Sequence, residues 1–322
     1  MLPTFTPKMR TSLLLLIMLA TASTQAQFTA IPQTLVTKTG TLKGTLIAPS
    51  NISKFPILIL QAGSGPTDRN GNSPFGLRSN SYRLLAEALA TQNIGTLLTD
   101  KRGIAESAPA GKDESALRFT DYSDDMVLWV KQLKKEKKTS CIFLAGHSEG
   151  SLIAMIAASK VKVKGYISLA GAGESIDKIL VWQVKQQSAP IARTLDSLLM
   201  RLRSQKNIDT IPPGLYALLR PSVQPYMSSW MQQDPCNIMK KLKIPTFIIQ
   251  GSNDIQVEVA QYEKLKNCKP SAEFLLIDGM SHILKAGPMD RTKNAATYND
   301  KSLPLMPGLA EAIGNFVNKR HK

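Results

Sequence analysis

The chain has 322 residues, of which 43% are hydrophobic and 20% charged, and its formal net charge is +16. This composition excludes a disordered chain and is sufficient for one large core or two small ones. The lysines are dispersed and lack interleaved aromatic residues, which favours a basic solvated surface over a nucleic-acid-binding patch. We therefore expect no nucleic-acid partner.

The first 26 residues have the pattern of a secretory signal peptide. Lys8 and Arg10 precede an apolar run at 13–20, and small residues follow up to Ala26. The run is far shorter than the roughly 20 residues that span a bilayer, and no later segment is long enough to do so. We expect cleavage after Ala26, a mature domain of residues 27–322, no membrane span after cleavage, and a periplasmic or secreted location. An uncleaved anchor is the alternative.

After the signal, apolar runs of strand length alternate with helical patterns. An alternating segment that turns at Gly40 predicts an antiparallel hairpin. Further strands are predicted within six apolar runs, at 55–63, 94–103, 141–146, 165–173, 244–254 and 272–282. Helical periodicity predicts helices at 81–92, 121–135, 149–160 and 309–319. The first of these helices is expected to be capped by Asn80 or Ser81. This alternation predicts an α/β fold with a mainly parallel sheet covered by helices on both faces.

The stretch from about 174 to 235 interrupts this alternation. It contains no strand-like run, only helical patterns broken by prolines. We interpret it as a helical cap inserted over the carboxyl edge of the sheet. Trp182, Tyr226 and Trp230 lie in it and either line an acyl pocket or form the small core of the insertion.

Three cysteines are too few and too scattered for a disulfide scaffold or a zinc site. Cys141 lies in an apolar strand and is expected in the core. Cys236 and Cys268 could pair in an oxidising compartment, and the sequence leaves that pairing open. No metal site is expected, and without a dinucleotide or phosphate-loop motif no cofactor is expected either.

The segment Gly146-His147-Ser148-Glu149-Gly150 lies where a predicted strand meets a predicted helix. A G-x-S-x-G sequence in this setting predicts a nucleophile elbow, in which a strained turn exposes the serine. Side chains at the two glycine positions would clash in such a turn. We therefore predict Ser148 as the nucleophile and the Glu149 backbone N–H as one donor to the oxyanion.

Serine needs a base, and the chain has only three histidines. His147 is part of the elbow and should point away from Ser148, whereas His321 belongs to the terminal tail. His282 follows the last predicted strand at the carboxyl edge of the sheet, which makes it the expected base.

A buried imidazole also needs a carboxylate to orient it. Asp254 ends the predicted strand at 244–254, which precedes the last predicted strand, and it is the expected acid. Asp278 is the rival, although it lies within the last strand segment. The order Ser148, Asp254, His282 agrees with the chain order of the hydrolase fold that uses this elbow.

On these residues the sequence resembles the α/β-hydrolase superfamily over nearly the whole mature chain. It is most similar to bacterial esterases with a "GSGP-x-DR" loop after the first parallel strand. The segments that carry this similarity are "QAGSGPTDRNGN" at 61–72, "DKRG" at 100–103, "GHSEG" at 146–150 and "YNDKSLPLMPGLAEAIGNFV" at 298–317.

The resemblance implies that the loop after the first parallel strand supplies a second oxyanion donor. Matching its glycine assigns that donor to the Ser64 backbone N–H, with Gly63 or Gly65 as alternatives. Asp68-Arg69 is expected to brace this loop, and Arg102 is expected to be structural.

The expected function is hydrolysis of carboxylic esters, with short acyl chains preferred, through an acyl-enzyme. The expected partner is a small-molecule ester, and the oligomeric state is left open. A peptidase or a thioesterase on the same fold is the first alternative, because all three reactions pass through an acyl-enzyme. A non-catalytic binding protein that keeps the fold is the second.

Overall fold

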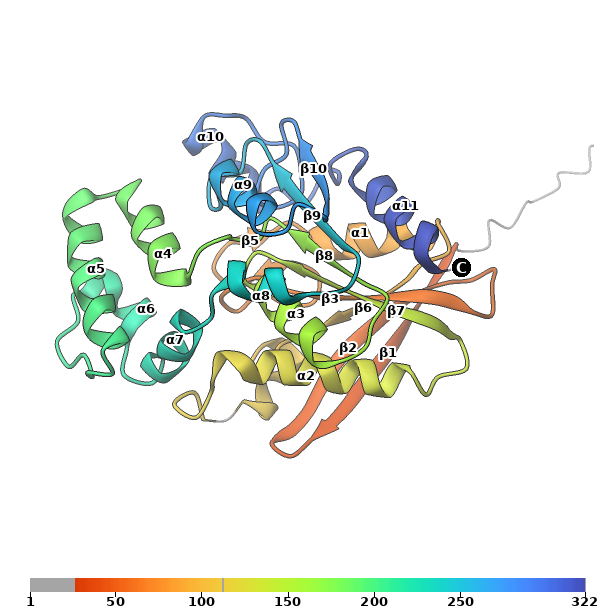
Figure 1. Cartoon of the computed structure of the whole chain (residues 1–322), viewed down its shortest axis with the longest axis horizontal. Coiled ribbons are helices and arrows are strands. Elements are labelled where there is room, and N and C mark those ends of the chain that lie inside the picture. Colours follow the sequence, from red (N-terminus) through yellow and green to blue (C-terminus); the bar gives the residue numbers. More distant parts are fainter. Residues whose placement is uncertain (1–26, 112, 322) are drawn as a thin grey trace, which may run out of the picture.

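The computed structural model describes residues 27–111 and 113–321, so the predicted signal peptide lies outside the described residues. An eight-stranded sheet runs through this part of the chain, in the order β1-β2-β6-β3-β7-β8-β9-β10 (Figure 1). The strands from β6 to β10 pair in parallel, and β1 and β2 are antiparallel. The strands are β1 (Phe28–Thr37), β2 (Gly40–Pro49), β3 (Phe55–Gln61), β6 (Gly95–Thr99), β7 (Thr139–His147), β8 (Gly165–Leu169), β9 (Thr246–Gly251) and β10 (Glu273–Ile277). The prediction of a mainly parallel sheet is confirmed.

Burial explains why the central strands are continuous apolar runs. All seven residues of β3 are buried, because its two faces are both covered by helices. Ile57 and Ile59 point into one core cluster, and Leu58 and Leu60 into the other. The predicted hairpin is also confirmed, since β1 pairs with β2 as far as Thr37 opposite Gly40.

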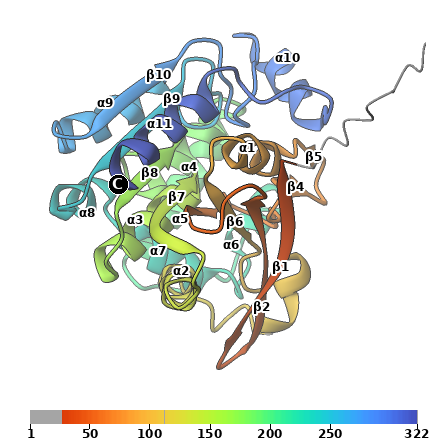
Figure 2. The ribbon, with the colours of Figure 1, turned by 90° about the vertical axis from the view of Figure 1, so that its right-hand side faces the viewer.

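Two groups of helices sandwich the sheet (Figure 2). One face is covered by α1 (Ser81–Ala90) and α11 (Leu309–His321). The other face is covered by α2 (Phe119–Leu133), α3 (Glu149–Lys160) and α9 (Val259–Cys268). Smaller elements are β4 (Asn72–Ser73), β5 (Leu77–Arg78), α10 (Arg291–Ala296) and the 3₁₀ turns Ala105–Ala110 and Thr297–Asn299. This architecture is the predicted α/β-hydrolase fold. In the described ranges, no helix combines the length and the hydropathy needed to cross a bilayer.

The start of α1 corrects one expectation, because neither Asn80 nor Ser81 caps the helix. Asn80 has a left-handed backbone (φ 51°) and its side chain accepts no capping hydrogen bond. Its Oδ1 instead accepts from Asn72 Nδ2, and its backbone N–H donates to Asn72 Oδ1. The Ser81 hydroxyl donates to the carbonyl of Ile283. The first turn of α1 therefore contacts the loop that carries His282.

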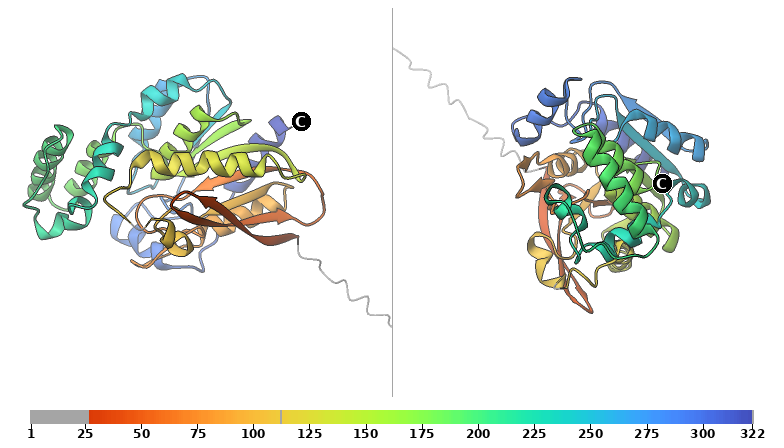
Figure 3. Two further views of the ribbon diagram at one scale, coloured as in Figure 1. Left: turned by 90° about the horizontal axis from the view of Figure 1, so that it is seen from below. Right: turned by 90° about the vertical axis from the view of Figure 1, so that its left-hand side faces the viewer.

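Between β8 and β9 the chain is helical, and its helices α4 to α7 project from one end of the sheet (Figures 1 and 3). The five helices here are α4 (Ile176–Lys185), α5 (Ala189–Arg203), α6 (Tyr216–Leu219), α7 (Gln224–Met231) and α8 (Pro235–Lys241), with a 3₁₀ turn at Pro213–Leu215. We call the segment from α4 to α8 the cap.

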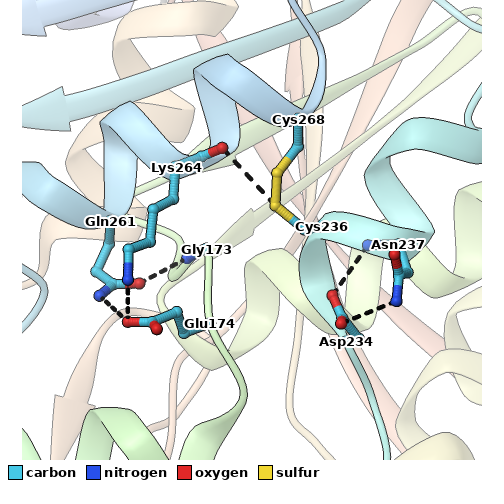
Figure 4. Close-up of a disulfide and its surroundings, with 8 residues drawn as sticks. All are labelled: Gly173, Glu174, Asp234, Cys236, Asn237, Gln261, Lys264 and Cys268. Carbon is cyan, nitrogen blue, oxygen red and sulfur yellow. Dashed lines mark hydrogen bonds and ion pairs between the residues drawn. A yellow bond between two sulfur atoms is a disulfide. The ribbon is translucent and has the colours of Figure 1, made fainter.

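Both ends of the cap are attached to α9 (Figure 4). Where the cap begins, Gln261 Nε2 and Lys264 Nζ contact Glu174 Oε2 at 2.8 and 2.6 Å. Where it ends, Cys236 of α8 forms a disulfide with Cys268 at the end of α9. The disulfide answers the question that the sequence left open. Because one helix of the sheet layer holds both ends, the base of the cap is fixed to the body of the protein.

Candidate active site

Ser148 occupies a strained turn between β7 and α3. Its backbone has φ 54° and ψ −121°, a region that few non-glycine residues adopt. A Cβ atom on Gly146 would collide with the backbone of Gly150, and one on Gly150 would collide with the carbonyls of Gln61 and Ala62. Both glycines are therefore required by close backbone contacts. These are the conformation and the packing of a nucleophile elbow.

Asp254 and His282 are joined by a hydrogen bond. His282 Nδ1 lies 2.7 Å from Asp254 Oδ2, and the two residues are only 4% and 8% exposed. The other carboxylate oxygen, Oδ1, accepts the backbone N–H groups of Gln256 and Val257 at 2.8 and 2.9 Å. Burial by itself would raise the pKa of Asp254, but His282 and these N–H donors outweigh burial and lower the pKa. Asp254 therefore stays ionised and holds the Nδ1–H tautomer, which leaves Nε2 of His282 as the basic nitrogen.

Asp278, the rival acid, makes no such contact. It is exposed, and its Oδ1 accepts a hydrogen bond from the Ser252 hydroxyl at 3.0 Å. Of the two acids considered from the sequence, only Asp254 lies against His282.

The preceding residue, His147, places Ser148 beside the Asp254–His282 pair. The ring of His147 packs against the ring of His282, with 4.6 Å between centroids. Ser148 itself is partly exposed, and no hydrogen bond to His282 is formed in the described part of the chain. Hydrogen bonds between nucleophile and base are often long in unliganded enzymes and shorten when substrate binds. The structure thus brings Asp254 and His282 together and places the elbow next to them.

His147 braces the loop of His282. Its Nε2 lies 2.7 Å from the His282 carbonyl oxygen, which can only accept, so Nε2 carries the proton. Nδ1 then accepts the hydroxyl of Tyr82 at 2.8 Å. Burial, and secondarily the neighbouring His282, lowers the pKa of His147 to about 3. His147 is therefore a neutral support. Its partner Tyr82 was not anticipated from the sequence.

The loop after β3 lies against the elbow and presents its backbone there. A Cβ on Gly63 would lie 3.3 Å from Ser148 Cβ. The Gly63 N–H donates to the Tyr82 hydroxyl at 3.2 Å, so this amide is occupied. In residues 27–111 and 113–321, the N–H groups of Ser64, Gly65 and Glu149 donate to no protein acceptor outside regular helix and strand bonding. Of the three alternatives for the loop donor, Gly63 has its N–H bound to Tyr82, whereas those of Ser64 and Gly65 have no such partner among the described residues.

A buried ion pair connects this loop with the elbow. Lys101 Nζ donates to the Gly63 carbonyl at 2.7 Å and to Glu149 Oε1 at 3.1 Å. The two side chains are only 2% and 3% exposed. The Tyr226 hydroxyl, from α7 of the cap, also donates to Glu149 Oε1, at 3.0 Å. Lys101 was not anticipated from the sequence, although its place just after β6, at the carboxyl edge of the sheet next to β3, was a usable signal.

The residues expected to brace the oxyanion loop do so. Asp68 Oδ1 accepts the backbone N–H groups of Asn70 and Asn72 at 2.8 and 2.9 Å. Arg69 forms an ion pair with Asp100 at 2.7 Å.

Arg102 forms a bidentate ion pair with Asp125 of α2. Its guanidinium therefore ties the segment after β6 to a helix of the sheet layer. The structural role expected for Arg102 agrees with these contacts.

The aromatic residues of the cap join it to the sheet layer. Trp230 stacks on Phe119 of α2, with 5.0 Å between centroids, and Tyr226 meets Tyr122 edge-on at 5.8 Å. Trp182 is half-buried. The contacts of Tyr226 and Trp230 with α2 were not among the two roles considered from the sequence, which were an acyl pocket and the insertion's own small core.

In the described ranges, no group of three or more His, Cys, Asp and Glu side chains is arranged to hold a metal ion. A cavity of about 310 Å³ adjoins the disulfide, and one of about 360 Å³ lies within the cap. Neither is lined by Ser148, Asp254 or His282, so both cavities lie away from the candidate site.

Together, the sheet order, the elbow and the acid–histidine pair define an α/β hydrolase. Residues 75–286 match the hydrolase family described as serine aminopeptidase, S33, and the chain belongs to this family. A relative, the esterase EstD of Thermotoga maritima, is 27% identical over 252 residues, which are 76% of this chain and 58% of EstD. The chain thus spans less than two thirds of that relative.

Two solved structures show the same fold. The Pyrococcus furiosus esterase Pf2001 has a TM-score of 0.59 at 19% identity, over 92% of both chains. Est1E from Butyrivibrio proteoclasticus has a TM-score of 0.58 at 17% identity, over 89% of this chain and 98% of that one.

The neutral state of His147 predicts a pH-dependent stability. Its pKa is about 3 when folded and about 6.5 when unfolded, so below pH 6.5 the unfolded chain binds a proton that the folded chain does not. The free energy of unfolding should therefore fall by about 1.4 kcal/mol per pH unit from this group as the pH drops below 6.5. His147→Gln should show a correspondingly smaller slope in denaturant titrations between pH 6.5 and 4.5. Parallel curves for the two proteins would contradict the assignment.

Proposed function

We propose that this protein hydrolyses carboxylic esters through an acyl-enzyme formed on Ser148. The observation that carries the proposal is the buried Asp254–His282 hydrogen bond next to a strained serine elbow. A serine held in a costly backbone conformation, beside a histidine whose tautomer is fixed, is an arrangement for nucleophilic catalysis.

In the proposed reaction, Ser148 Oγ attacks the ester carbonyl while Nε2 of His282 takes the hydroxyl proton. The backbone N–H groups of Ser64 and Glu149 bind the oxyanion of the tetrahedral intermediate. His282 then returns the proton to the leaving alcohol, and the acyl group stays on Ser148. Water attacks the acyl-enzyme with the same base, which releases the acid and restores the serine. Asp254 stabilises the His282 imidazolium in both acylation and deacylation.

The comparisons support an ester as substrate, because EstD and Pf2001 are both named as esterases. We further place this chain among the bacterial esterases with the "GSGP-x-DR" loop. The loop's contacts support that placement, since Arg69 pairs with Asp100 of "DKRG" and the next residue, Lys101, binds the loop's Gly63 and the Glu149 of "GHSEG".

The family description makes an aminopeptidase the second candidate. Such an enzyme must bind the ammonium group of its substrate, for which a free carboxylate near the nucleophile would serve. Glu149 directly follows Ser148, but its carboxylate is already paired with Lys101 and Tyr226. This pairing favours the esterase. Rates on the ester, the thioester and the amide of one acid would separate the three hydrolases, and labelling by a fluorophosphonate would exclude a non-catalytic binding protein.

Substitutions in the proposed triad test the mechanism. Ser148→Ala should lower kcat by on the order of 10⁶, because the nucleophile is lost. Asp254→Asn should lower it by on the order of 10⁴, because His282 would hold the wrong tautomer. The matched control is Asp278→Asn, which removes an exposed carboxylate bound only to Ser252 and should leave kcat unchanged in a steady-state ester assay. A larger loss at Asp278 than at Asp254 would reject the assignment of the acid.

We also propose that the preferred acyl chains are short. The disulfide attaches the base of the cap to α9. A second attachment joins α7 of the cap to α2 and α3, through the Phe119–Trp230 stack and the Tyr226–Glu149 hydrogen bond. A roof fixed at both places limits the length of the acyl group beneath it. It also lacks the freedom of a lipase lid that opens at a fat surface.

Specificity should therefore rise and then fall with acyl length. Each buried methylene contributes about 0.8 kcal/mol until the space is filled, and further carbons displace packed side chains at about 1–3 kcal/mol. We expect the highest kcat/KM at roughly two to six carbons and no jump above the solubility limit of the substrate. A series of p-nitrophenyl esters measures this. A kcat/KM that still rises at twelve carbons, with interfacial activation, would refute the proposal.

We propose that the protein is exported to the periplasm or beyond and that the export signal is removed. The basic and apolar pattern of residues 1–26 supports this, and so does the Cys236–Cys268 disulfide, since such bonds persist in oxidising compartments.

N-terminal sequencing of protein recovered from the periplasm or the medium should begin at Gln27, because the small residues up to Ala26 form the cleavage site. The disulfide should be present in the same material, as measured by thiol alkylation before and after reduction. Recovery of a chain that begins at Met1 would contradict the signal.

A further inference from the structure

We propose that Lys101 is a positioning residue for catalysis: it sets the direction and the donor strength of the Ser64 backbone N–H in the oxyanion hole. The inference deepens the proposed esterase function and rests on it. It concerns a buried lysine that touches neither the nucleophile nor the base, yet contacts both segments that supply oxyanion donors.

The peptide unit between Gly63 and Ser64 links Lys101 to the proposed oxyanion donor. Its carbonyl belongs to Gly63 and its N–H to Ser64, and in a planar trans peptide these two groups point in opposite directions. Lys101 Nζ lies 2.7 Å from that carbonyl. By fixing where the carbonyl points, the ammonium also fixes where the N–H points. A cation bound to the carbonyl polarises the peptide as well, which strengthens its N–H as a donor.

Independent contacts hold the same residues from the other side. The N–H of Gly63 donates to Tyr82, so the peptide unit before Gly63 is anchored too. Ser64 is exposed at its position in the loop. Without Lys101, the Gly63–Ser64 peptide would have no described partner on its carbonyl side and could rotate away from Ser148.

The second contact of Lys101 explains how a charged group is accommodated there. Glu149 Oε1 binds Lys101 at 3.1 Å and receives the Tyr226 hydroxyl at 3.0 Å, and the Lys101 ammonium lies 5.2 Å from the centre of the Tyr122 ring. Glu149 also carries the other predicted oxyanion donor on its backbone. An unpaired carboxylate at this place would oppose the negative charge that develops on the substrate oxygen. Lys101 neutralises it.

The central experiment compares Lys101→Met with wild type. Methionine keeps the length of the buried stem but cannot donate to Gly63. Because the oxyanion develops in the transition states and tetrahedral intermediates and is absent from the bound ester, kcat should fall about 10- to 100-fold while KM changes little. The fall is smaller than that for loss of a donor, since the Ser64 N–H is misdirected but present. An unchanged kcat, or a change confined to KM, would refute the proposal.

Loss of Lys101 also leaves Glu149 buried without its counter-ion, which destabilises the fold. The double variant Lys101→Met/Glu149→Gln removes that effect. It should regain the stability lost in the single variant, as measured by denaturant unfolding, but not the lost kcat, since the Gly63 carbonyl still lacks its donor. Recovery of both would show that Lys101 serves only charge balance, and the proposal would be wrong.

Arg102→Met is the matched control. Arg102 is the next cation in the chain, and its buried ion pair with Asp125 faces α2 instead of the oxyanion loop. This variant should lose stability and keep the kcat of the folded protein. A loss of kcat equal to that of Lys101→Met would mean that any broken ion pair in this segment has the same effect, against the proposal.

The amide resonance of Ser64 gives a readout that needs no substrate. Its ¹⁵N signal should move upfield in Lys101→Met, where the preceding carbonyl loses its cation, and stay in place in Arg102→Met. An unmoved signal in Lys101→Met would overturn the positioning role. If wild type neither hydrolyses esters nor reacts with a fluorophosphonate, the esterase function fails, and this resonance still decides the role of Lys101.

Discussion

The site depends on one close approach between two backbones. Where β7 turns into α3, Gly150 lies directly against the carbonyls of Gln61 and Ala62 at the end of β3. No side chain fits between them, so the helix that begins at the nucleophile and the loop that follows β3 are held in contact. Because of this contact, the loop's backbone lies beside Ser148. The strain at Ser148 is sustained by the same packing, since β3 and β8 pair with β7 almost up to the turn.

Around this contact, the hydrogen bonds and charges fix the protonation state and the orientation of each polar side chain. His147 is neutral and donates from Nε2, Tyr82 links it to Gly63, and Asp254 is ionised against His282. Burying an ion pair is costly unless its hydrogen bonds are satisfied. Lys101 and Glu149 meet that condition with donors and acceptors from the loop, the elbow and the cap. The groups at the elbow are thus oriented before substrate arrives, which is the condition for strong electrostatic stabilisation of a transition state.

The sequence was informative where burial or strand order determines position. Continuous apolar runs located the central strands, and Asp254 and His282 were found because both follow strands whose carboxyl ends meet at one edge. Helix α9 was missed because it is largely polar and buries few of its residues, such as Tyr262 and Leu265. Tyr82 was missed for another reason. Its contacts with Gly63 and His147 join segments far apart in the chain, and no local pattern encodes such a contact.

The missed helix matters for the cap. Asp254 lies in the loop that leads from β9 into α9, and α9 holds both ends of the cap through Glu174 and the Cys236–Cys268 bond. The proposed catalytic acid and the base of the cap therefore share one support. At its other attachment the cap contacts Glu149 through Tyr226, next to the proposed nucleophile. A displacement of the cap would strain contacts at both the acid and the elbow. The cap is thus joined both to the helix that follows Asp254 and to the residue that follows Ser148.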